Sequence, residues 1–180
     1  MKRTLIRPNG VPNSISEQVV TPIMPSVVYA SDSPDALDKQ YEGEQKGYTY
    51  AREGHPNAEI LALLIDKLEG SGSGLVVSSG MAAIASLIMG TLSSGDHVLG
   101  GSQLYGRTLR LMREDLPRFG IQTSFADPTN IQSVKNEVRK NTKMILIECV
   151  SNPTLRVADI EGIATLCKKN NILLAVDNTF

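Results

Sequence analysis

The stretch Gly74-Leu75-Val76-Val77-Ser78-Ser79-Gly80-Met81-Ala82-Ala83-Ile84 decides the fold of this chain. Residues 75–78 predict a buried strand, and the Ala and Leu residues that follow Gly80 recur at helical spacing, which predicts a helix. The first backbone N–H groups of a helix have no intrahelical partners, and with the positive end of the helix dipole they favour a phosphate. We therefore expect a phosphate-bearing ligand near Gly80, although a strand–turn–helix unit that binds nothing has the same pattern.

The rest of the chain after this stretch alternates between short apolar runs and amphipathic segments. The predicted strands are 97–100, 121–125, 144–148 and 172–176, and the predicted helices are roughly 80–92, 105–116, 130–139 and 159–169. A helix between each pair of strands is typical of a parallel sheet covered by helices. The predicted fold class is therefore α/β, with five strands when 75–78 is included.

Residues 1–55 differ from this pattern. Prolines and glycines interrupt them repeatedly, and only Ser33–Tyr41 predicts a short helix, with Ser33 as N-cap and Pro34 at its first position. Because the segment is too apolar for a free tail, we expect an arm that lies on another subunit. Residues 56–69 predict a helix that ends at Gly70, and we expect the cofactor-binding domain to begin at residue 56.

Composition excludes several classes of protein. The chain has 180 residues with 18 basic and 19 acidic side chains, which argues against a dedicated nucleic-acid surface. No apolar run approaches the ~18 residues of a membrane span, and we expect no secretory signal in Met1–Pro8. Cys149 and Cys167 lie in apolar patterns, which favours buried thiols in a reducing compartment, and hence the cytoplasm.

Polar residues follow the predicted strands, where an open α/β sheet binds its ligands. Asp177 follows an apolar strand and could pair with a protonated ring nitrogen, bind Mg²⁺, or cap the next turn. Tyr105 could stack on a planar ring, or could be an ordinary loop residue. His55 and His97 lack neighbours that would complete a metal site, so we interpret both as structural and expect no metal.

Five short motifs occur along the chain in the order found in a known family of enzymes. They are Tyr50-Ala51-Arg52-Glu53-Gly54-His55-Pro56, Ser79-Gly80-Met81-Ala82-Ala83, Tyr105-Gly106-Arg107-Thr108, Glu148-Cys149-Val150-Ser151-Asn152-Pro153-Thr154 and Asp177-Asn178-Thr179-Phe180. In this order they resemble the Cys/Met-metabolism family of pyridoxal-phosphate enzymes, which includes cystathionine γ-synthase, cystathionine lyase, methionine γ-lyase and homoserine sulfhydrylase. The sequence departs from the family at His55-Pro56-Asn57 and at Val28-Tyr29.

The resemblance implies a fold-type I large domain, incomplete in this chain, and the following roles in binding pyridoxal 5′-phosphate. Gly80 and Met81 offer N–H groups to its phosphate, and Tyr105 stacks on its ring and assists catalysis. Asp177 pairs with the ring nitrogen, which keeps the ring an electron sink. Tyr50 and Arg52 reach the phosphate of a neighbouring subunit in a dimer, or a dimer of dimers. The remaining cofactor residues it implies are Asn152, near the phenolic oxygen of the ring, and Glu148 and Thr179, which support the site.

The resemblance also implies a Schiff-base lysine downstream of Asp177, whereas all nine lysines of this chain precede that residue. We therefore expect the 180 residues alone to be inactive, and interpret them as part of a longer enzyme of sulfur amino-acid metabolism. Its reaction would be β- or γ-elimination or γ-replacement. One alternative is a catalytically inactive protein that associates with full-length subunits. The other is a different fold-type I pyridoxal-phosphate enzyme, such as an aminotransferase.

Overall fold

A computed structural model describes residue 16 and residues 19–180. The chain divides into two compact units, Met1–Val76 and Val77–Phe180, which are described separately. The beginning of the predicted arm, including Pro8 and Pro12, lies outside the described residues.

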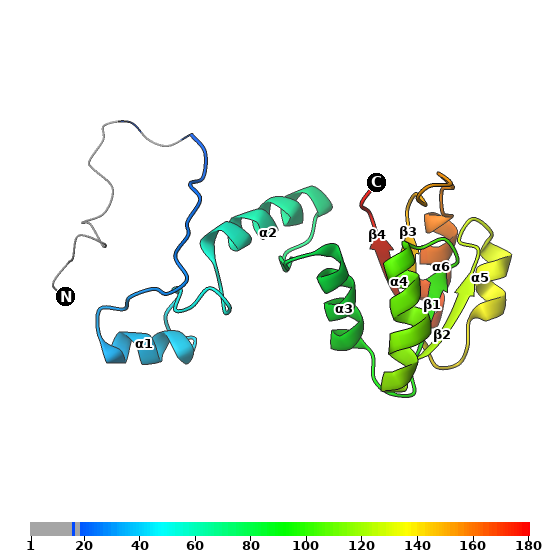
Figure 1. Cartoon of the computed structure of the whole chain (residues 1–180), viewed down its shortest axis with the longest axis horizontal. Coiled ribbons are helices and arrows are strands. Elements are labelled where there is room, and N and C mark those ends of the chain that lie inside the picture. Colours follow the sequence, from blue (N-terminus) through cyan, green and yellow to red (C-terminus); the bar gives the residue numbers. More distant parts are fainter. Residues whose placement is uncertain (1–15, 17–18) are drawn as a thin grey trace. The chain divides into compact units, whose positions relative to one another are not determined.

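The unit Val77–Phe180 is built on a four-stranded parallel sheet (Figure 1). Its strands are β1 (His97–Gly101), β2 (Gln122–Ala126), β3 (Thr142–Glu148) and β4 (Leu173–Asp177), in the spatial order β2-β1-β3-β4. Each corresponds to a strand expected from the sequence, so the prediction of a parallel α/β sheet is confirmed.

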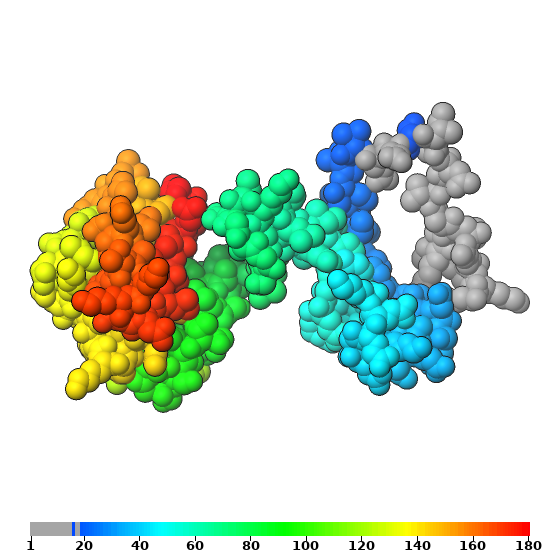
Figure 2. All heavy atoms as spheres, turned by 180° about the vertical axis from the view of Figure 1, so that it is seen from behind, coloured from blue at the N-terminus to red at the C-terminus, as the bar shows by residue number. Residues whose placement is uncertain are grey.

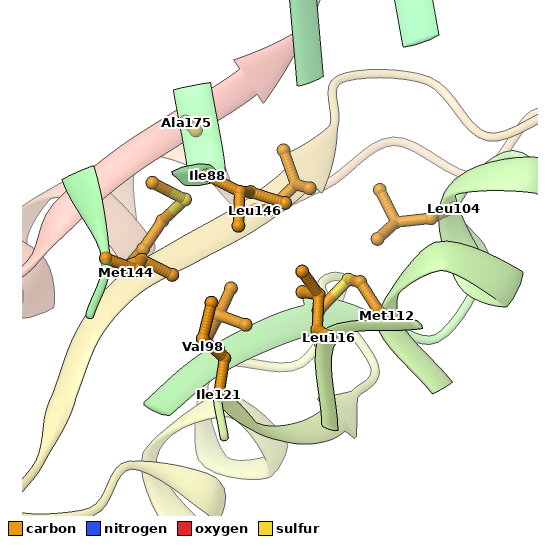
Figure 3. Close-up of a cluster of buried hydrophobic side chains, with 10 residues drawn as sticks. Ile88, Val98, Leu104, Met112, Leu116, Ile121, Met144, Leu146 and Ala175 are labelled. Carbon is orange, nitrogen blue, oxygen red and sulfur yellow. The ribbon is translucent and has the colours of Figure 1, made fainter. Parts of the chain in front are cut away.

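Helices cover both faces of this sheet, and each face has its own core (Figure 1). Helix α3 (Gly80–Thr91) and the helical segment that begins with α4 (Gly106–Arg110) pack on one face. Figure 3 shows that core, in which Val98, Met144 and Leu146 of the strands meet Met112 and Leu116. Helices α5 (Ile131–Glu137) and α6 (Ile160–Asn170) pack on the other face through Val134, Ile163 and Cys167.

The helix expected over 105–116 is less regular than predicted. It consists of α4, a π-helical turn at Leu111–Asp115 and a 3₁₀ turn at Leu116–Phe119. Pro117 lacks an N–H group and cannot continue the α-helical hydrogen-bond ladder. Gly120, at φ 75°, then ends the segment in a left-handed conformation that suits glycine.

The prediction of a strand over residues 75–78 is wrong, because these residues form no strand. Leu75 is 81% exposed, and no sheet strand of the described chain pairs with this segment. A strand needs a hydrogen-bonded partner, and hydrophobicity alone does not supply one. β4 is consequently the last strand on its side of the sheet, and Figure 2 shows its red atoms at the surface of this unit.

The unit Met1–Val76 contains α1 (Pro34–Tyr41) and α2 (Pro56–Glu69). The hydroxyl of Ser33 accepts a 3.1 Å hydrogen bond from the Ala36 N–H, which confirms the predicted N-cap. Gly70 ends α2 with φ 67°, as the sequence predicted. A bridge between Val28 and Tyr50 joins the segment before α1 to the segment before α2.

Both cysteines are buried and unpaired, as expected from their apolar neighbours. In residue 16 and residues 19–180, no helix is both long enough and apolar enough to span a bilayer.

Candidate functional site

A cavity of about 450 Å³ lies at the carboxyl ends of β1, β3 and β4 and at the start of α3. Seven of the residues proposed from the sequence line it together: Gly80, Met81, Tyr105, Glu148, Asn152, Asp177 and Thr179. The sheet thus gathers in one place side chains that are up to 99 positions apart (from Gly80 to Thr179).

The start of α3 forms one wall of the cavity. Ser79 is its N-cap: the Ser79 hydroxyl accepts a 3.1 Å bond from the Ala82 N–H, and its carbonyl accepts a 3.0 Å bond from the Ala83 N–H. In the part of the chain that the structure describes, no hydrogen bond occupies the N–H groups of Gly80 and Met81. A built Cβ on Gly80 would meet no atom within 4 Å, so this end of the helix is open. It can accept an anion such as a phosphate.

Tyr105 lies at the rim, between β1 and α4, and 52% of its surface is exposed. Its backbone N–H donates a 2.5 Å hydrogen bond to Oε1 of Glu148, the last residue of β3. The backbone of Tyr105 is therefore hydrogen-bonded to the sheet. Its ring stays exposed and accessible to a ligand.

Glu148 and Asp177 are register partners at the ends of β3 and β4, and both line the cavity. Burial raises the pKa of Glu148 above its usual range, and the negative charge of Asp177 raises it further. The Tyr105 N–H and the nearby backbone of Asn152 lower that pKa. Asp177, in contrast, accepts hydrogen bonds on Oδ1 from the backbone N–H and the hydroxyl of Thr179.

The loop between β3 and α6 forms a further side of the cavity through Asn152. The hydroxyls of Ser151 and Thr154 are 2.7 Å apart, and Thr154 also donates to Oε1 of Gln103 in the β1–α4 loop. Arg156 fixes the far end of this loop through a 2.7 Å ion pair with Asp127. These contacts hold the loop in place beside the cavity.

The other two proposed cofactor residues, Tyr50 and Arg52, lie in the unit Met1–Val76. The guanidinium carbon of Arg52 is 4.6 Å from the centroid of the Tyr50 ring, so the structure brings these two side chains together. The Arg52 side chain is 74% exposed and forms a 3.8 Å ion pair with the neighbouring Glu53.

The sequence analysis did not propose four residues that also line the cavity, which are Ser79, Ile84, Val150 and Phe180. Ile84 lies one helical turn after Gly80, so helical periodicity could have placed it on the same face. Val150 and Phe180 follow the ends of β3 and β4 by two and three residues, but their apolar character gave no chemical signal.

The two histidines have structural positions, in agreement with the sequence interpretation. Nδ1 of His55 accepts a 3.2 Å bond from the Asn57 N–H and caps α2. His97 is fully buried between hydroxyl groups of neighbouring strands.

Comparison with known proteins identifies the family. The family model described as Cys/Met metabolism PLP-dependent enzyme matches residues 3–180, where PLP is pyridoxal 5′-phosphate. The chain belongs to this family. The resemblance predicted from the sequence is therefore confirmed, and the family to which the chain belongs is PLP-dependent.

Two curated relatives of this chain are lyases. L-methionine gamma-lyase from Fusobacterium nucleatum subsp. nucleatum is 36% identical over 172 residues, which are 95% of this chain and 44% of that protein. Cystathionine beta-lyase MetC from Bacillus subtilis is 44% identical over 133 residues, which are 74% of this chain and 34% of that protein. The chain therefore spans less than half the length of these relatives.

Solved structures show the same fold. The metY protein of Campylobacter jejuni, whose crystal structure contains N′-pyridoxyl-lysine-5′-monophosphate, has a TM-score of 0.83 and 32% identity, covering 90% of this chain and 40% of that one. The metB protein of Corynebacterium glutamicum has a TM-score of 0.82 and 36% identity, covering 94% of this chain and 42% of that one. The unit Val77–Phe180 thus contains part of a fold-type I large domain.

The chemistry of the cavity suits each part of PLP. Open N–H groups at the α3 start suit its phosphate, the exposed Tyr105 ring suits its pyridine face, and the Asp177 carboxylate suits its ring nitrogen. A cavity of about 450 Å³ is also within the range of cofactor sites.

Proposed function

We propose that this chain forms the cofactor site of a PLP-dependent enzyme of sulfur amino-acid metabolism, which catalyses β- or γ-elimination or γ-replacement. The observation that carries the proposal is the meeting of the α3 start, the Tyr105 ring and the Asp177 carboxylate in one cavity. The activity is proposed for the whole protein, because the chain spans 44% of its methionine γ-lyase relative.

In this proposal each residue has a separate task. Gly80 and Met81 would bind the phosphate, and Tyr105 would orient the ring and is the candidate for moving a proton through its hydroxyl. Asp177 would hold the proton on the ring nitrogen, and Asn152 would lie near the ring oxygen. Bound in this way, PLP supplies an electron sink for negative charge at the α-carbon of an amino acid.

The proposal also includes identical subunits, as a dimer or a dimer of dimers. Tyr50 and Arg52 would reach the phosphate of a neighbouring site, and the exposed guanidinium of Arg52 supports this role. Exposed apolar side chains of the arm, such as Val19 and Ile23, suit burial against another subunit. The two unpaired, buried cysteines favour a cytoplasmic location.

Binding of pyridoxamine 5′-phosphate tests the cofactor site, because this amine analogue binds without forming a bond to a lysine. We expect saturable binding to the purified protein, at least tenfold weaker in Asp177→Asn. Glu161→Gln, which removes a charge on the exposed start of α6, is the matched control. Wild-type protein that does not bind, or an Asp177→Asn variant that binds equally well, would refute the site.

Borohydride reduction tests the catalytic part of the proposal. Reduction in the presence of PLP should add the mass of one pyridoxyl phosphate to a lysine of the active protein, and a thiol or oxo acid should be released from a sulfur amino acid. A protein of 19.5 kDa that takes up no covalent cofactor would instead support the inactive, subunit-associating alternative.

A further inference from the structure

Glu148 connects the sheet to the segment that carries Tyr105. Its Oε1 accepts a 2.5 Å hydrogen bond from the Tyr105 N–H across 43 positions of sequence. Tyr105 precedes α4 and has no side-chain cap contact there, and half of its surface is exposed. The Tyr105 carbonyl bonds within the following helical segment, whereas its N–H is held by Glu148, which ties this residue to the end of β3.

Glu148 lines the cavity, but its second carboxyl oxygen is not accessible there. Oε2 is buried and has no hydrogen-bond partner within the described residues. Glu148 also lines a small adjoining cavity of about 10 Å³, together with Ser151, Thr129 and Arg156. Oε2 is closed to a ligand and Oε1 is occupied by the Tyr105 N–H, so Tyr105 is the direct contact through which Glu148 can act on a ligand.

We propose that Glu148 is a positioning residue, which fixes the Tyr105 backbone so that the exposed ring stays across the cavity and stacks on a planar ligand. The stacking partner rests on the proposed function, whereas the anchoring of Tyr105 does not. Without this anchor the segment keeps the burial of Leu104 in the core and the 3.0 Å bond from the Leu109 N–H to the Tyr105 carbonyl, but the Tyr105 N–H loses its carboxylate partner.

Amide hydrogen exchange at Tyr105 tests the anchor without any ligand. Glu148→Asp keeps the charge but shortens the side chain by one methylene, whereas Glu148→Gln loses the charge but keeps an acceptor oxygen at the same distance. We expect exchange at Tyr105 to become at least tenfold faster in Glu148→Asp and to stay within about threefold of wild type in Glu148→Gln.

Two controls separate this effect from general loosening. Glu161→Gln should leave exchange at Tyr105 unchanged, and the Leu99 amide in β1 should keep its protection in every variant. Equal exchange at Tyr105 in wild type and Glu148→Asp would overturn the proposal. Faster exchange in Glu148→Gln, equal to that in Glu148→Asp, would support the anchor and show that the negative charge of the acceptor contributes to it.

A double-mutant cycle tests the consequence for binding. Tyr105→Ala removes the ring but keeps the backbone N–H that Glu148 contacts. We expect Glu148→Asp to weaken binding of pyridoxamine 5′-phosphate about tenfold when the ring is present and less than twofold in the Tyr105→Ala background. Equal losses in both backgrounds would overturn the proposal. If wild-type protein binds no analogue, the proposed function fails, and the exchange measurement still decides the anchoring role.

Discussion

The buried imidazole of His97 makes the stability of this protein dependent on pH. His97 begins β1 and is fully buried. Its Nδ1 lies 2.8 Å from the Thr142 hydroxyl on β3, and its Nε2 lies 2.9 Å from the Ser124 hydroxyl on β2. The ring thus joins three strands at the end of the sheet opposite to the cavity.

Burial lowers the pKa of His97 from 6.5 to about 4, and the positive charge of Arg139 adds to this effect. Between these two pKa values the unfolded chain binds a proton that the folded chain does not, so the free energy of unfolding falls as pH decreases. Each pKa unit corresponds to about 1.4 kcal/mol, which gives a loss of about 2 kcal/mol from pH 7 to pH 5 and roughly 3 kcal/mol by pH 4.

Urea unfolding of wild-type protein and His97→Gln at pH 7 and pH 5 measures this loss. Glutamine does not titrate, so the variant should be less stable at pH 7, whereas its stability should fall by about 2 kcal/mol less than that of wild type between the two pH values. Carboxylates contribute equally to both proteins and cancel in the comparison. The same pH dependence in both proteins would refute the reasoning.

Three other predictions concern the core, a turn and the cavity. Ile163→Ala empties a fully buried site between α6 and the sheet, and should cost about 2–5 kcal/mol in urea unfolding; a loss below 1 kcal/mol would contradict its place in the core. Gly120→Ala should destabilise by at least about 1 kcal/mol, since φ is 75° and the new Cβ would approach the Ser94 hydroxyl at 2.2 Å; unchanged stability would refute that strain. Asp177→Asn should abolish turnover of the intact enzyme while leaving the thermal midpoint within a few degrees of wild type; an unchanged rate would remove Asp177 from the site.

Local sequence pattern was sufficient for most of the unit Val77–Phe180. Its strands are short apolar runs, and helices such as α6 have strong caps and amphipathic spacing, so local preference and tertiary packing agree. The segment 75–78 shows the limit of this reasoning, because an apolar run becomes a strand only beside a partner. The break of the helix around Pro117 was visible in the sequence, although the π-helical turn before it was not.

Sequence reasoning predicted the polar part of the cavity better than its apolar part. Asp177 and Glu148 could be placed because parallel strands end at one edge of a sheet. Val150 and Phe180 have no distinctive chemistry, and the contact between Glu148 Oε1 and the Tyr105 backbone depends on a side-chain conformation that no residue pattern specifies. The roles proposed for these residues come from the family resemblance, whereas the structure shows that the residues lie close together.

The pairing of Glu148 with Asp177 across β3 and β4 restricts how this protein can change over time. Side chains alternate between the two faces of a strand, so an insertion or deletion of one residue within β4 would turn Asp177 to the opposite face and bring Val176 or Asn178, respectively, to its position. The connection from α6 to β4 can vary in length without this consequence. Lineages that retain the cavity should therefore vary in length in the connecting loops and not within these two strands.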